Sequence, residues 1–153
     1  MKNILIIIFI FLVNTSYSQG FNNDKVELSN FLKRMYNASP FEDVKLMEDY
    51  DNKYLISVLS LEKAKYQSAS IMNRVAQVKA QSQTSRFFNG STVSEDFIIR
   101  TTETTQSNNT TSVTETFQMI KENSIGFVNG LELLTNFEIE EGKKMLFIYI
   151  KQL

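Results

Sequence analysis

The sequence predicts an α+β domain built as a two-layer sandwich, with one long helix packed on an antiparallel meander sheet and a short helix near the amino terminus. Two observations favour this class. Apolar residues recur at helical spacing through the segment 61–87, and the chain then changes to a composition dominated by threonine, valine, phenylalanine and isoleucine. A switch from helical period to strand composition is typical of helices packed on one face of an antiparallel sheet.

Residues 1–18 have the pattern of a secretory signal peptide. Lys2 precedes an unbroken apolar run over residues 4–13, and small polar residues follow it. The run is shorter than the roughly 20 apolar residues that a membrane span needs, so an uncleaved anchor is the weaker alternative. Cleavage after Ser18 leaves residues 19–153 as a single domain. Since no cysteine follows for lipidation, we expect an exported periplasmic or secreted protein without a lipid anchor.

The charge balance excludes several classes of partner. Lysine and arginine total 16 and aspartate and glutamate total 17, and loss of the leader changes the balance to 15 minus 17, or −2. This net charge gives no electrostatic reason to bind nucleic acid or an anionic membrane. The absence of cysteine from an exported chain favours a bacterial envelope protein over an animal secreted one.

The first half predicts a helix, a hairpin and a long helix. Residues 26–36 have one apolar face, with Asp24 as an amino-terminal cap. Residues 44–60 predict a hairpin around the turn "EDYDN". The long helix is expected over about residues 64–90, where Asn89 and Gly90 end it. Its predicted buried stripe comprises Leu61, Ala64, Ala69, Met72, Val75, Ala76 and Ala80, and its predicted exposed residues include Lys63, Gln67, Arg74, Lys79 and Gln81.

The second half predicts strands. The segment 91–124 is rich in threonine and is expected to form two long antiparallel strands joined at "QSNNT", although residues 115–122 fit a helix as well. The chain then closes with a strand kinked at Gly130, a turn at "EEGK" and a final strand.

This order of elements resembles a known family. The strand "KYLISVLS" leads into an alanine-bearing helix that ends in "FFNG", and the threonine-rich pair is followed by "FVNGLELLTNFEIEEGKKMLFIYI". The arrangement resembles the LPP-twenty-like family of bacterial envelope lipoproteins over residues 53–150, and more loosely the amino-terminal domain of flagellar assembly protein T. The resemblance implies a helix packed on a sheet, an envelope location and a role in assembly or at the surface, with no catalytic residues. This chain departs from the lipoproteins because it lacks the lipidated cysteine.

No catalytic, cofactor-binding or metal site is predicted, and the chain is expected not to be an enzyme. The absence of histidine and cysteine excludes serine and cysteine triads and the usual zinc sites. Glu48, Asp49, Asp51 and Asn52 bring oxygen ligands together, but their spacing is not that of a calcium-binding hand, so we expect a solvated turn.

The final strand "MLFIYI" is apolar on both sides. Met145, Phe147 and Tyr149 alternate with another apolar set, which predicts that both faces are covered. The long helix covers one face, and either the first helix or a second protein molecule covers the other. Met145, Phe147 and Tyr149 are therefore the candidate interface residues, and binding is expected to use the sheet rather than the long helix.

Two functions follow from these observations. The first is a non-enzymatic envelope protein that associates with itself or docks to another envelope protein. The second is a small module that holds an apolar or lipid-like ligand between helix and sheet.

Overall fold

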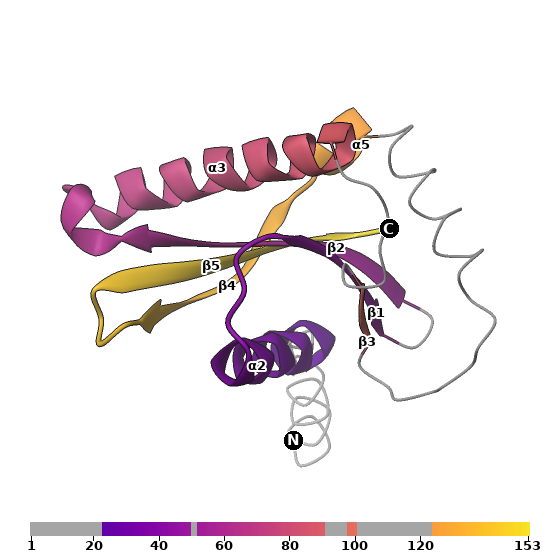
Figure 1. The fold of residues 1–153 in the computed structure, drawn as a ribbon, viewed down its shortest axis with the longest axis horizontal. Helices are drawn as coiled ribbons and strands as arrows, with labels where there is room; N and C mark the ends of the chain where they lie inside the picture. Colours follow the sequence, from indigo (N-terminus) through magenta and orange to yellow (C-terminus); the bar gives the residue numbers. More distant parts are fainter. Residues whose placement is uncertain (1–22, 50–51, 91–97, 101–123) are drawn as a thin grey trace, which may run out of the picture.

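The computed structural model describes residues 23–49, 52–90, 98–100 and 124–153, which form a mixed sheet with helices on both faces (Figure 1). The elements in chain order are α2 (Asn23–Ala38), β1 (Val44–Asp49), β2 (Asn52–Glu62), the short 3-10 helix η1 (Lys63–Lys65), α3 (Ala69–Gly90), β3 (Ile98–Arg100), α5 (Ser124–Asn129), β4 (Glu132–Ile139) and β5 (Lys144–Gln152). The combination of helices with a largely antiparallel sheet confirms the predicted α+β class.

The strand order is β3-β1-β2-β5-β4, which differs from the predicted meander. The pairs β1–β2, β2–β5 and β4–β5 are antiparallel, whereas β3 lies parallel to β1. The last strand, β5, is inserted between β2 and β4. The strand β5 is apolar on both sides because α2 covers one of its faces and α3 covers the other.

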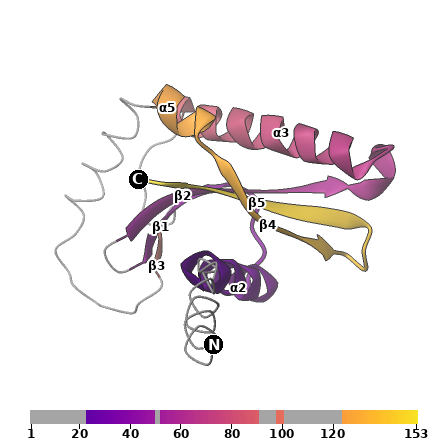
Figure 2. The ribbon, with the colours of Figure 1, turned by 180° about the vertical axis from the view of Figure 1, so that it is seen from behind.

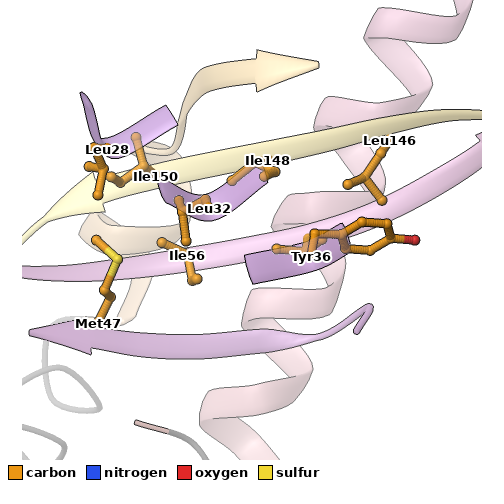
Figure 3. Close-up of a cluster of buried hydrophobic side chains, with 9 residues drawn as sticks. Leu28, Leu32, Tyr36, Met47, Ile56, Leu146, Ile148 and Ile150 are labelled. Carbon is orange, nitrogen blue, oxygen red and sulfur yellow. The ribbon is translucent and has the colours of Figure 1, made fainter. Parts of the chain in front are cut away.

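The layers also differ from a two-layer sandwich. Figures 1 and 2 show α3 along one face of the sheet and α2 across the other, so that the sheet is the middle of three layers. A cluster of buried side chains joins α2 to the strands, with Leu28, Leu32 and Tyr36 facing the sheet (Figure 3). The first helix thus covers the face of β5 that carries Leu146 and Ile148, without a second molecule.

The helix α2 follows the predicted helical period but is longer than expected. Leu28, Leu32 and Tyr36 recur every four residues and are the buried side of the helix. Val26 was expected on this side, yet its side chain is 50% exposed. Asp24 lies within the helix, which begins at Asn23, so it does not occupy the predicted cap position before the first turn.

The long helix α3 begins later than predicted. Leu61 belongs to β2 and Ala64 to η1, and the α-helix starts at Ala69. The hydroxyl of Ser68 accepts a hydrogen bond from the backbone N–H of Ile71 at 3.3 Å, as expected for a serine that caps a helix. The buried residues of α3 are Met72, Ala76, Ala80, Thr84, Phe87 and Phe88, and Ala69 is exposed. The alanines bring the helix backbone close to the strands, because they have no larger side chain to separate them.

The carboxyl-terminal segment corrects the prediction at Gly130. We expected a kink within a strand, but Gly130 follows the short helix α5 and its N–H donates to the carbonyl of Gly126 at 3.1 Å. The predicted turn at "EEGK" is present between β4 and β5. Its residues Glu140, Glu141 and Gly142 have φ angles of 50°, 55° and 82°, the left-handed region that a tight reversal requires.

Several predictions fall outside the described residues. The leader and its cleavage site belong to residues 1–22, and the alternative between strand and helix concerns residues 115–122. Of the two long strands expected over 91–124, the structure describes the short strand β3.

Candidate functional surface

The predicted interface residues lie in the core beneath α3. Phe147 is fully buried and Tyr149 is 3% exposed, and both pack in a cluster with Met72, Ala76 and Ala80 of α3. Met145 is partly buried against the same cluster. The long helix therefore covers the side of β5 that was assigned to a partner, which makes these three residues a poor candidate for an interface. The apolar alternation of β5 shows that both of its faces are buried, but it does not show which helix packs on which face.

Tyr149 fixes the position of the helix over the sheet. Its hydroxyl donates a hydrogen bond to the backbone carbonyl of Asn73 at 3.4 Å, which links β5 to α3. Burial raises the pKa of Tyr149 above the ordinary value, since the phenolate would lose its hydration there. The neutral side chain is a structural anchor rather than an acid or a base.

Polar groups between α3 and the sheet offer no catalytic arrangement. Gln83 donates from Nε2 to the carbonyl of Val58 at 3.2 Å. The hydroxyls of Ser57 and Thr84 are buried in the same layer, and neither has a hydrogen-bond partner within the described part of the chain. A serine or threonine nucleophile needs a base that takes its proton, and no described group is hydrogen-bonded to either hydroxyl.

In each of the two acidic turns a glutamate pairs with a lysine, Glu48 with Lys53 and Glu140 with Lys144. Strands β1 and β2 extend into "EDYDN", so that Asp49 pairs with Asn52 across the hairpin. At the other turn Glu140 binds Lys144 at 2.7 Å, and this hydrogen bond raises the pKa of the Lys144 ammonium group. Within residues 23–49, 52–90, 98–100 and 124–153, no three carboxylates lie close enough together to hold a metal ion.

A polar hollow of about 330 Å³ lies near the amino-terminal end of α2. Lys25 and Glu132 form an ion pair of 3.1 Å at this hollow, and Gln152 donates to Asn52 at 3.2 Å. The remaining lining residues are Leu28, Tyr54, Gly130, Ile150 and Lys151. The ion pair is exposed and most of the lining residues are polar, so the hollow resembles ordinary hydrated surface more than a ligand site, which is mostly apolar.

The outer edge of β4 is poorly suited to adding another strand. A register shift between Leu133 and Thr135 marks a β-bulge in its pairing with β5. Glu132 and Glu138 are exposed on the same strand. Bulges and charges on an edge strand are the features by which proteins discourage edge-to-edge pairing.

The side of α3 that faces away from the sheet has a distinct composition. Ile71 and Val78 are 46% and 64% exposed, and Val75 lies between them at the margin of the core. Three exposed cations share this side of the helix. We call this set the outer face of α3, and its residues are Ile71, Arg74, Val75, Val78, Lys79 and Arg86.

The sequence contains a signal for this surface that the prediction overlooked. Arg74 and Lys79 were expected to be exposed, which the structure confirms. Ile71 and Val78 are exposed seven residues apart and form a second apolar stripe, and Val75, which was predicted for the buried stripe and packs against the core cluster, lies between them. The prediction assigned one apolar stripe to this helix, so the apolar residues on its other side were left without a role.

Within the described ranges, no helix is both long and apolar enough to cross a membrane. The outer face of α3 is the candidate functional surface. Comparisons of the chain with protein-family models, with curated proteins and with solved structures find no match.

Proposed function

We propose that this protein is a non-enzymatic, exported envelope protein that docks to another component of the envelope through the outer face of α3. One observation carries the proposal. Isoleucine and valine side chains are exposed beside cations on an outer helix, in a domain whose sheet is covered by its own helices on both faces. Ile71 and Val78 lie together on α3, whereas Val26, Ile125 and Leu133 are exposed singly on other elements. Contiguous exposed apolar surface is typical of interaction sites.

The chemistry of the chain supports a role without catalysis. The sequence has no histidine or cysteine, and the buried hydroxyls of Ser57 and Thr84 have no hydrogen-bonded base among the described residues. The apolar run at residues 4–13 supports export, as does the resemblance in element order to the LPP-twenty-like family. The proposal places this protein in the envelope on those grounds.

The packing of one long helix on the sheet has a particular role in this proposal. The buried side of α3 holds the domain together through Met72, Ala76 and Ala80, and the opposite side is left for docking. One helix can do both because its apolar residues are divided between two sides.

A module that encloses an apolar ligand between helix and sheet is the second hypothesis. The layer between α3 and the strands is occupied by side chains that include Leu59, Met72 and Phe147. The hollow beside α2 lies on another part of the domain and has mostly polar lining residues. These observations favour docking over ligand storage.

Fractionation of a secreting bacterium tests the proposal. We expect the exported protein to sediment with the envelope, and the paired change Ile71→Ser with Val78→Ser to move most of it to the soluble fraction. The matched control is Val26→Ser with Leu133→Ser, which removes two exposed apolar side chains elsewhere and should leave the distribution unchanged. An identical distribution of the α3 variant and the parent, both folded by circular dichroism, would contradict the proposal.

A further inference from the structure

The charges of the domain are segregated, with α3 carrying cations alone. Its 22 residues include Arg74, Lys79 and Arg86 and no aspartate or glutamate, although acids outnumber bases by one in the whole chain. The described acids lie on the other elements and connections, and several are paired there with lysines, as Glu140 is with Lys144. The surface at α3 is therefore locally positive although the net charge of the protein is slightly negative.

The helical geometry interleaves these cations with the exposed aliphatic residues. At about 3.6 residues per turn, Ile71 and Val78 lie on the same side of the helix, with the partly buried Val75 between them. Arg74 lies on one flank of this stripe, and Lys79 and Arg86 lie on the other flank. All three cations are exposed, and none of their side chains forms an ion pair or a hydrogen bond with another described residue. Their positive charge is thus not neutralised by the described acids.

From this arrangement we propose that the outer face of α3 binds the anionic headgroup layer of a lipid bilayer. This inference rests on the docking function proposed above and names the component to which the protein docks. A helix with aliphatic side chains flanked by lysine and arginine can lie in the plane of the interface, where the aliphatic groups enter the acyl boundary and the cations reach the phosphates.

The form of the surface favours lipid over an acidic protein. The helix lies along the outside of the domain and is about 33 Å long (Figures 1 and 2). Charges of opposite sign meet across a protein interface, so a protein partner would need acids placed opposite Arg74, Lys79 and Arg86, whereas anionic headgroups are present wherever the helix lies. An interface with an anionic bilayer has no use for acids, and α3 has none.

The negative total charge does not prevent this binding. At physiological ionic strength the screening length is about 8 Å, so a surface responds mainly to the charges that touch it. The acids of α2 and of the turn at Glu140 and Glu141 are on other parts of the domain, and the turn acids are paired. When the domain contacts a bilayer through α3, the charges nearest to the lipid headgroups are the cations of this helix.

Vesicle sedimentation tests the inference with the exported protein, after amino-terminal sequencing has established that the leader is absent. The vesicles contain equal amounts of phosphatidylglycerol and phosphatidylcholine, or phosphatidylcholine alone. We expect binding to the anionic vesicles, weakened by salt, and little binding to the neutral ones. A cation near an anionic surface contributes roughly fivefold to affinity, so replacing Arg74, Lys79 and Arg86 by glutamine should weaken binding about a hundredfold.

The matched control changes Lys25, Arg34 and Lys143 to glutamine, which gives the same change in net charge at exposed positions outside α3. It should bind anionic vesicles nearly as well as the parent. Equal losses in the two variants would mean that net charge acts without a specific surface, and this would overturn the inference. So would a parent that does not bind anionic vesicles.

Two results separate this inference from the docking function. If the protein sediments with the envelope through the outer face of α3 but does not bind protein-free vesicles, docking is retained and lipid is excluded as the partner. If light scattering shows that the parent is an oligomer and that the variant of Ile71 and Val78 is a monomer, a second copy covers this face and the lipid inference is likewise refuted.

Discussion

The buried hydroxyl of Thr84 predicts a substitution that stabilises the domain. Thr84 is fully buried between α3 and the sheet, and within the described residues its Oγ1 has no hydrogen-bond partner. Burying a hydroxyl without a partner costs about 1–3 kcal/mol. Thr84→Val keeps the shape of the side chain and replaces the hydroxyl by a methyl group, and the two residues have similar helix propensities. We therefore expect the free energy of unfolding to rise by about 1–2 kcal/mol.

Thr84→Ser is the matched variant with the opposite expectation. It keeps the hydroxyl and removes a buried methyl group, so it should lower the free energy of unfolding by about 1 kcal/mol. Urea titration measures both changes, provided that the dependence on denaturant is the same as in the parent. In a thermal melt each kcal/mol corresponds to about 3–5 °C for a domain of this size. The reasoning is refuted if Thr84→Val destabilises the protein by 1 kcal/mol or more, because the hydroxyl would then be making a favourable hydrogen bond.

Four further outcomes follow from the sequence and the packing. Ala76→Arg should lower the free energy of unfolding by about 3 kcal/mol or more, because Ala76 is fully buried. The exposed control Lys79→Ala should change it by less than about 0.5 kcal/mol. Equal effects of the two substitutions in urea titration would mean that the buried side of α3 is misassigned. Joint replacement of Phe147 and Tyr149 by serine should abolish cooperative melting, since loss of one buried aromatic typically costs about 3–5 kcal/mol; a folded monomer would contradict their place in the core. Chelation should leave the melting temperature unchanged, and a calcium-dependent increase would reveal a metal site. Amino-terminal sequencing of the exported protein should begin at Gln19, and a mature product that retains the apolar run would refute cleavage.

Local patterns were sufficient for much of the secondary structure. The helical period placed Leu32 and Tyr36 on the buried side of α2 but missed Leu28, and the apolar alternation of "MLFIYI" indicated a strand with two covered faces. These features are legible because a helix or strand repeats its environment at a fixed period. Where a local hydrogen bond sets a boundary, the pattern is less informative. The start of α3 depends on the Ser68 cap, and alanines upstream of it continued the apolar period without continuing the helix.

The sequence by itself determined the α+β class, the two-sided cover of the last strand and the absence of histidine and cysteine chemistry, since each of these follows from composition or from a period within one segment. Only the tertiary structure decided that β5 lies between β2 and β4, that α3 rather than a partner covers Phe147 and Tyr149, and that α2 covers the opposite face. It also decided that Ile71 and Val78 remain exposed beside cations of α3 that form no ion pair with another described residue. The physical reason is that packing joins segments far apart in the chain, and an apolar stripe has the same pattern whether a sheet covers it or it remains at the surface.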